Sequence, residues 1–213
     1  MSRIGIGVIT CGVREPRDLL APSGATVIRY VDVERRGAAH ARNQVLKALY
    51  DAGSDFIFMF DDDCYPIMPG WAECFIEQHR LTRYHFLGLP EAFKSRPLAL
   101  RGEVMHWDTV IGCFSFQTRL FMERVGYYNA AYRGYGYEDA GRNARAVRSG
   151  LCGSLGYPSP LRSTSYILSE DVYDRNPVPN LTPEEKRVGM DANRPIWTAE
   201  NLASQIYYPY TEV

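Results

Sequence analysis

Hydrophobic residues over the first 60 positions form two patterns, short continuous runs typical of strands and a three-to-four-residue period typical of a helix. Three short apolar runs are typical of buried strands, and they cover residues 4–10, 25–33 and 55–60. Between the second and third runs, apolar residues recur every three or four positions over residues 37–53, which predicts an amphipathic helix. This order of elements predicts an α/β fold with a mostly parallel sheet flanked by helices.

The pattern beyond the third run predicts further helices with loops between them. Helices are expected over three stretches, residues 69–83, 119–125 and 138–149. Residues 87–105 mix prolines and glycine with charged side chains, so we expect a loop with at most short strands, followed by a strand over residues 109–116. Residues 127–136 are expected to form an aromatic, glycine-bearing loop. The Thr-Pro-Glu-Glu sequence at 182–185 is a capping box that predicts another helix start.

Length and composition limit the class of protein. The chain has 213 residues, of which 46% are hydrophobic, which fits one domain with a real core and excludes a disordered chain or a disulfide-stapled mini-fold. A net charge of -1 provides no global basic field for nucleic acid or membrane, although a local basic patch is compatible with it. The five cysteines lack zinc-ligand spacing, and no signal peptide or membrane-length run is present, so we expect a soluble, cytoplasmic protein.

Three consecutive aspartates, Asp61, Asp62 and Asp63, directly follow the third apolar run. In open α/β sheets ligands bind beyond the carboxyl ends of the strands, so these carboxylates are expected to face a ligand. Adjacent negative charges repel one another unless a cation neutralises them, and Mg²⁺ or Mn²⁺ prefers oxygen ligands. The sequence therefore favours a divalent-metal site over a solvated acidic turn.

A second acidic pair, Glu138 and Asp139, lies at the start of the helix expected over residues 138–149. The helix dipole favours acidic residues at this position, so one interpretation is charge matching alone. The other interpretation is that a carboxylate takes the proton of an attacking substrate hydroxyl, with the flanking glycines allowing a close approach. The pair by itself does not decide between the two.

Two segments together resemble nucleotide-sugar glycosyltransferases of the GT-A fold. The donor half of family 2 members is similar to ARNQVLKALYDAGSDFIFMFDDDCYPIMPGW at 41–71, which places an Ala-Arg-Asn helix before an apolar strand and a D-x-D motif. The acceptor half, including that of the β-1,4-galactosyltransferases, is similar to GCFSFQTRLFMERVGYYNAAYRGYGYEDAGRNARAVRSG at 112–150. Two matching halves in the family's order are far more specific than a lone D-x-D.

The resemblance implies how the chain is divided. Residues 1–150 would form a GT-A, Rossmann-like catalytic core, and the remaining residues 151–213 would form an extension that packs on it. Within the core, residues 1–68 would bind the nucleotide sugar and residues 104–150 would bind the acceptor. The fold would also include a small antiparallel element on the acceptor side.

The resemblance also implies a role for each matched residue. The implied donor-binding residues are Thr10, Arg14, Asp32, Arg42, Asp61 and Asp62. Asp63 and Asp61 would bind the cofactor, Mn²⁺ or Mg²⁺. Asp139 would be the general base of an inverting reaction, and Glu138 would hold the acceptor. The implied acceptor-binding residues are Trp107, Asp108, Gly112, Tyr135, Gly136 and Tyr137.

The resemblance implies a metal-dependent, inverting enzyme that moves a hexose from a nucleotide-diphosphate sugar to an acceptor hydroxyl. A UDP-sugar is the expected donor. The acceptor is either a saccharide or a hydroxymethylated base in phage-type DNA. DNA would require a local basic face, whose candidates are Arg80, Arg83, Lys94, Arg96 and Arg101. Arg142, Arg145 and Arg148 step along one helix, where they could contact phosphates, but a solvated face paired with nearby acids is the expectation. Arg145 matches a family arginine expected to be structural.

Two other classes of protein stay open. One is a non-catalytic nucleotide-sugar-binding protein, which would not need Asp139. The other is a sugar-phosphate nucleotidyltransferase, although its glycine-rich signature loop is absent from TCGVREP at 10–16. Many relatives bind the metal with a histidine after the Glu-Asp helix, but the histidines here all precede it: His40, His79, His85 and His106.

Overall fold

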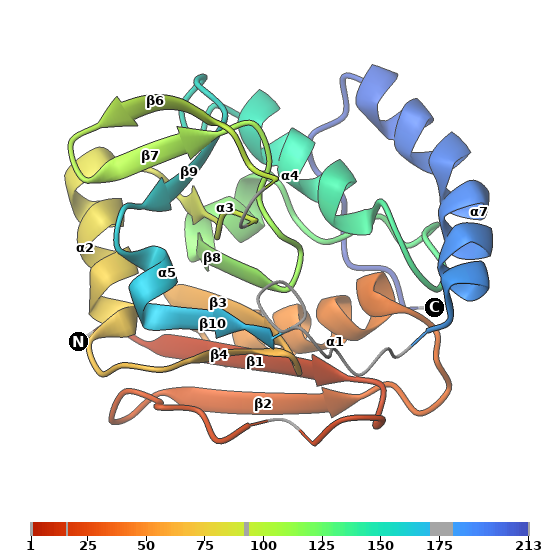
Figure 1. The fold of residues 1–213 in the computed structure, drawn as a ribbon, viewed down its shortest axis with the longest axis horizontal. Coiled ribbons are helices and arrows are strands. Elements are labelled where there is room, and N and C mark those ends of the chain that lie inside the picture. Colours follow the sequence, from red (N-terminus) through yellow and green to blue (C-terminus); the bar gives the residue numbers. More distant parts are fainter. Residues whose placement is uncertain (1, 16, 92–93, 171–180, 213) are drawn as a thin grey trace.

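The central feature of the fold is a five-stranded sheet in the order β2-β1-β3-β8-β5, seen in a computed structural model that describes residues 2–15, 17–91, 94–170 and 181–212. The strands are β1 (Ile4–Thr10), β2 (Thr26–Val31), β3 (Phe56–Asp61), β5 (Phe86–Leu87) and β8 (Phe114–Thr118). β1 is parallel to β2 and β3, whereas β8 is antiparallel to β3 and β5. The α/β fold with a mostly parallel sheet is therefore confirmed (Figure 1). The expectation of a buried strand is wrong for β2, whose residues are exposed or half-buried because it lies at the edge of the sheet.

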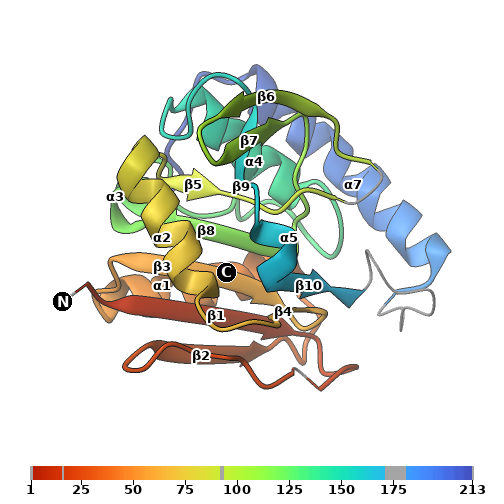
Figure 2. The same cartoon turned by 60° about the vertical axis from the view of Figure 1, so that its left-hand side comes forward.

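Side-chain alternation along β3 explains why helices cover both faces of the sheet. Phe58 and Phe60 pack edge-on against Trp71 at the start of α2 (Trp71–Thr82). Ile57 points to the opposite face and shares a core cluster with residues of α1 (Ala38–Asp51). Figures 1 and 2 show the two helices on opposite sides of the sheet.

The register of the first three strands brings their carboxyl ends to one edge. Ile9 of β1 pairs with Asp61 of β3, and Thr10 pairs with Val31 of β2. The backbone N–H of Asp32, just after β2, donates to the carbonyl of Thr10 at 2.8 Å. Thr10, Asp32 and Asp61 therefore lie along the same edge of the sheet.

The other helices within the described residues are α3 (Arg119–Arg124), α4 (Glu138–Arg148), α5 (Ser163–Tyr166) and α7 (Pro183–Leu202). α4 contacts both α1 and α7, and α7 begins with the capping box expected from the sequence. Of the expected C-terminal extension, residues 171–180 and 213 lie outside the described residues. No described helix combines the length and the apolar character that crossing a membrane requires.

The stretch expected as loop over residues 87–105 contains more strand than its composition indicates. β6 (Pro97–Arg101) and β7 (Val104–Trp107) form a hairpin, and β9 (Tyr157–Pro160) pairs with β7 to complete an antiparallel sheet. The resemblance implies a small antiparallel element, and this sheet is one, although β6 and β9 lie outside residues 104–150. A second small sheet pairs β4 (Cys64–Pro66) with β10 (Ile167–Ser169).

Candidate active site

Arg42 of α1 connects the two acidic motifs that are far apart in the sequence. Its Nη2 donates to both carboxylate oxygens of Asp61, at 2.8 and 2.7 Å, and to the carbonyl of Gly112 at 3.0 Å. Its Nη1 donates to both oxygens of Asp139, at 2.8 and 2.9 Å, and to Glu138 at 3.3 Å. The Arg42 side chain is only 3% exposed, so these partners supply the compensation that a buried guanidinium requires.

Burial makes the two central carboxyl groups weaker acids than usual. It raises the pKa of Asp61 to about 6 and the pKa of Asp139 to about 7, although Arg42 opposes both shifts. The hydroxyl of Tyr128 donates to Asp139 Oδ1 at 3.2 Å, and burial raises the pKa of Tyr128, which keeps this hydroxyl protonated. A carboxyl group whose pKa is raised in this way can accept a proton near neutral pH.

Gly112 allows Asp139 to approach the backbone before β8. A Cβ atom at this position would lie 2.0 Å from Asp139 Oδ2 and 2.6 Å from its Cγ. No other amino acid fits without moving the carboxyl group away from its hydrogen bonds with Arg42.

A cavity of about 280 Å³ opens beside Asp139. Four of the implied acceptor residues line it together with both acidic residues of α4: Asp108, Tyr135, Gly136, Tyr137, Glu138 and Asp139. Two implied residues do not line it. Gly112 lies behind Asp139, and Trp107 is the last residue of β7, where it pairs with Tyr157 of β9.

The sequence reasoning did not single out every residue that lines the cavity, and Asn143 and Tyr157 are two of those it missed. Asn143 lies one helical turn after Asp139 on α4, so helical spacing could have identified it. Tyr157 reaches the cavity through the pairing of β9 with β7, a contact for which the sequence contains no local signal.

The implied donor-binding residues hold the carboxyl edge of the sheet together. Thr10 Oγ1 donates to Asp62 Oδ2 at 2.6 Å, which links the ends of β1 and β3. Asp32 accepts backbone N–H groups of Arg36 at 3.0 Å and of Gly37 at 2.7 Å. The backbone carbonyl of Arg14 is 3.3 Å from Thr10 Oγ1, so Arg14 lies beside the same edge.

Asp63 lies at the turn after β3 and is connected to β10. Its backbone carbonyl accepts the N–H of Glu170 at 2.8 Å, and its Oδ2 is 3.5 Å from the hydroxyl of Ser169. Asp61 and Asp63 offer the hard oxygen donors that Mg²⁺ and Mn²⁺ select, and substrate phosphates usually complete such a site, so this donor set fits the implied ion. Among the described residues, no three His, Cys, Asp or Glu side chains are grouped to hold a metal.

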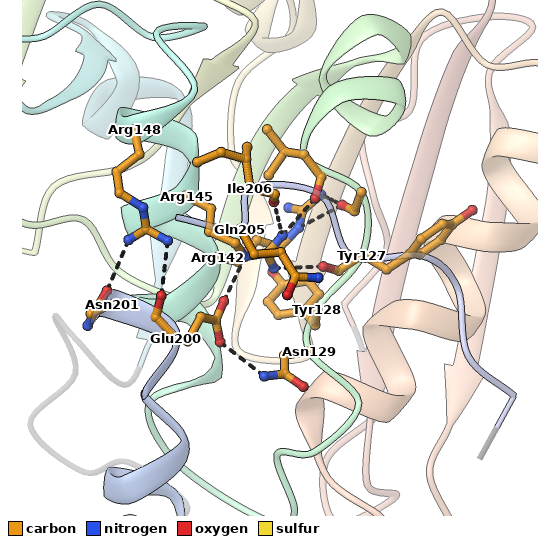
Figure 3. A network of polar contacts seen from close by, with 12 residues as sticks. Tyr127, Tyr128, Asn129, Arg142, Arg145, Arg148, Glu200, Asn201, Gln205 and Ile206 are labelled. Atoms are coloured by element: carbon orange, nitrogen blue, oxygen red, sulfur yellow. Dashed lines mark hydrogen bonds and ion pairs between the residues drawn. The ribbon is translucent and has the colours of Figure 1, made fainter. Parts of the chain in front are cut away.

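The solvated arginine face expected on α4 is wrong for two of its three members. Arg145 is fully buried, and its guanidinium donates to Glu200 of α7 at 2.6 Å and to the carbonyls of Val125 and Tyr127 at 2.7 Å each (Figure 3). Arg142 is also buried and donates to the carbonyl of Gly126 at 3.0 Å. Arg145 is buried because α7 and the chain after it cover this side of α4. Arg142 is buried because it packs against α3 and the turn that follows, where it contacts Met122 and Gly126. The structural role expected for Arg145 agrees with these contacts.

The basic residues considered for a nucleic-acid face are not all available near the cavity. Arg96 forms an ion pair with Asp108 at 2.7 Å, and Lys94 forms one with Glu91. The other three lie at the end of α2 or at the end of β6: Arg80, Arg83 and Arg101.

No family model and no curated protein matches the chain. The solved structures to which the chain is similar include two glycosyltransferases and a nucleotidyltransferase. The mannosyltransferase PcManGT from Pyrobaculum calidifontis, solved with GDP-Man and Mn²⁺, is 14% identical over 74% of this chain and 55% of its own, with a TM-score of 0.49. The chain thus spans about half of that protein.

The catalytic domain of Drosophila β1,4-galactosyltransferase 7, solved with xylobiose, is 16% identical over 89% of this chain and 79% of its own, with a TM-score of 0.45. A putative glucose-1-phosphate thymidylyltransferase from Bacillus anthracis, solved with a sucrose, is 11% identical over 79% of this chain and 67% of its own, with a TM-score of 0.44. All three likenesses are distant.

Proposed function

We propose that this protein is an inverting nucleotide-sugar glycosyltransferase in which Asp139 is the general base. The observation that carries the proposal is the arrangement around Arg42. This one buried side chain binds Asp61 at the carboxyl edge of the sheet and Asp139 beside the 280 Å³ cavity. A donor at the edge and an acceptor in the cavity would therefore meet at adjacent carboxylates.

The donor would lie along the edge formed by Thr10, Asp32 and Asp61, within the implied nucleotide-sugar half at residues 1–68. Asp63 and Asp61 would hold Mn²⁺ or Mg²⁺ there. When bound, such an ion neutralises the charge that develops on the departing diphosphate. A UDP-sugar is the first donor to test.

The acceptor hydroxyl would attack the anomeric carbon from the cavity side. As the new carbon–oxygen bond forms, the bond from the anomeric carbon to the diphosphate oxygen breaks, and the hydroxyl proton passes to Asp139. The nucleoside diphosphate leaves on the opposite face, so a single displacement inverts the anomeric centre. The pKa of Asp139, raised to about 7, suits it for accepting this proton.

The cavity favours a saccharide acceptor over DNA. Its lining contains three carboxylates, those of Asp108, Glu138 and Asp139, which would repel the phosphates of a nucleic acid. The tyrosine side chains at positions 135, 137 and 157 offer ring faces and hydroxyls suited to an uncharged sugar ring.

A panel of nucleotide sugars tests the donor and the metal together. We expect one UDP-sugar to raise the melting temperature in the presence of Mn²⁺, because a ligand that binds only the folded state stabilises it, and we expect EDTA to abolish the increase. The same donor should be transferred to members of a panel of mono- and disaccharides. If no nucleotide sugar stabilises the protein or is turned over, the proposal is wrong.

Asp139→Asn tests the general base. Removing a positioned base lowers rates by roughly 10²- to 10⁴-fold, so we expect transfer to fall by at least about 100-fold while calorimetry shows nearly unchanged donor binding. The matched control is Asp51→Asn. Asp51 is the last residue of α1, far along the helix from Arg42, and it forms an exposed pair with Lys47. Unaltered transfer by Asp139→Asn would remove the base role, and donor binding without any turnover by the unmodified protein would favour a non-catalytic binding protein.

A further inference from the structure

The loop over residues 133–137 forms one wall of the cavity and contains little regular structure. Three of its backbone positions have a positive φ: Gly134 at 60°, Gly136 at 100° and Tyr137 at 70°. A tyrosine is rarely stable in this region, so the conformation of Tyr137 requires support from its surroundings. The loop therefore depends on contacts with other elements to keep its shape.

Asn193 of α7 provides much of this support through its side-chain amide. Its Oδ1 accepts the backbone N–H of Arg133 at 3.2 Å. Its Nδ2 lies within donating distance of three carbonyls, those of Arg133 at 2.8 Å, Tyr135 at 3.1 Å and Gly136 at 2.9 Å. Asn193 is only 1% exposed, so water does not compete for these bonds.

The backbone of α7 approaches the loop closely at two points. A Cβ atom on Gly189 would lie 2.7 Å from the carbonyl oxygen of Tyr135, and one on Gly136 would lie 2.8 Å from Met190 Cγ. The rings of Tyr137 and Trp197 stack with their centroids 5.1 Å apart. The amide contacts of Asn193 thus belong to a close-fitting interface between α7 and the loop.

α7 is in turn anchored to the helix that carries the candidate base. Arg145 of α4 and Glu200 of α7 form an ion pair at 2.6 Å with both side chains 0% exposed (Figure 3). α4 begins at Glu138 and Asp139, directly after the loop. Two sets of contacts therefore fix Asn193 relative to Asp139. One is the set of hydrogen bonds between Asn193 and the loop before α4, and the other is the ion pair between α7 and α4.

We propose that Asn193 is a positioning residue that sets the shape of the acceptor side of the cavity. By holding the backbone of residues 133–136, it places Tyr135 and Tyr137 where an acceptor contacts them and reaches Asp139. Asn193 touches no reacting atom. The loop that it holds lines the cavity and would keep water from taking the place of the acceptor. The catalytic part of this inference rests on the proposed function.

Asn193→Ala tests the proposal at two levels. Hydrogen–deuterium exchange should increase at least about tenfold in peptides covering residues 133–137 and stay unchanged in β1 and β3, because only the loop loses its bonds. With the donor and saccharide panels described above, the KM for the saccharide should rise and the ratio of donor hydrolysis to transfer should increase several-fold. Calorimetry should show an unchanged Kd for the nucleotide sugar.

Two further variants separate positioning from a general loss of stability. Asn201→Ala is the matched control, because Asn201 lies on the same helix. Its Oδ1 accepts an exposed hydrogen bond from Arg148 at 3.3 Å. Gly189→Ala keeps Asn193 and favours the helix, yet its Cβ would displace Tyr135. It should therefore raise the KM for the saccharide while α7 remains folded.

Each outcome decides a different part of the proposal. Unchanged exchange over residues 133–137 in Asn193→Ala would overturn the role of Asn193 in holding the loop. Increased exchange with an unchanged saccharide KM and an unchanged hydrolysis ratio would overturn its role in positioning the acceptor. Absence of turnover by the unmodified protein would overturn the proposed function, and with it the catalytic part, while the exchange measurement would still test the loop.

Discussion

Single residues determine how closely the two halves of the candidate site approach each other. Arg42 was implied as a donor-binding residue, but in the structure its guanidinium is shared between Asp61 and Asp139. Arg42 follows the buried Ala41 in α1, and this placement in the helix can be predicted from the local sequence. Its partner Asp139 is 97 residues away in the sequence, so only the packing of α4 beside α1 shows what Arg42 binds.

The close contact between Gly112 and Asp139 leads to a prediction at the scale of one residue. Gly112→Ala should lower the free energy of unfolding by about 1–3 kcal/mol, because the added Cβ overlaps the carboxyl group at 2.0 Å. Urea denaturation measures the change. In an Asp139→Ala background the same substitution should be much less destabilising, since the overlapping atoms are gone. An equal loss in both backgrounds would show that the contact is not responsible.

Elements such as α4 and the β6–β7 hairpin show where periodicity predicts structure well and where it does not. The predicted bounds of α1, α2, α3 and α4 agree with the observed helices to within two residues. The expected strand at residues 109–116 begins only at Phe114, because Thr109 and Val110 line the cavity and the carbonyl of Gly112 accepts from Arg42. Side chains and backbone committed to a site are not free to follow a strand ladder.

The buried ion pair between α4 and α7 leads to a prediction at the scale of elements. Glu200→Gln should reduce the free energy of unfolding by about 3–5 kcal/mol, because it leaves the charge of Arg145 buried without its counter-ion. The matched control is Glu184→Gln, in an exposed pair with Arg187 on the same helix, which should change stability by no more than about 1 kcal/mol. Denaturant midpoints measure both. Similar effects of the two substitutions would contradict the structural role of Arg145.

Across the whole molecule, a nearly balanced net charge of -1 conceals a strong local concentration of acid. Asp61, Glu138 and Asp139 all contact Arg42, so three carboxyl groups share one buried cation. The burial that raises the pKa of Asp61 to about 6 and of Asp139 to about 7 follows from packing of the entire fold around them. Local sequence cannot reveal such shifts, because the distance and burial of every neighbour contribute.

These shifts predict how stability depends on pH. In the unfolded chain both aspartates titrate near about 4, so between pH 4 and 7 the folded state binds more protons than the unfolded state. Their contribution to stability is therefore complete at low pH and is lost as pH rises through about 6 and 7. The test compares the unfolding free energies of the unmodified protein and Asp139→Asn, both in EDTA. The difference, unmodified protein minus variant, should decrease from pH 5 to 8. For Asp51→Asn the same difference should stay flat over this range, and a flat difference for Asp139→Asn would contradict the raised pKa.

The sequence by itself determined the first three strands, the helix between them and the acidic motifs after β3 and at the start of α4. Those features depend on local periodicity and on the chemistry of adjacent side chains, both of which can be read along the chain. Only the tertiary structure decided that Arg42 joins the two motifs, that Arg142 and Arg145 are buried, and that Asn193 holds the cavity wall. These contacts join residues distant in sequence, and they form because whole elements bury their apolar faces against one another, which brings together polar groups that no local pattern relates.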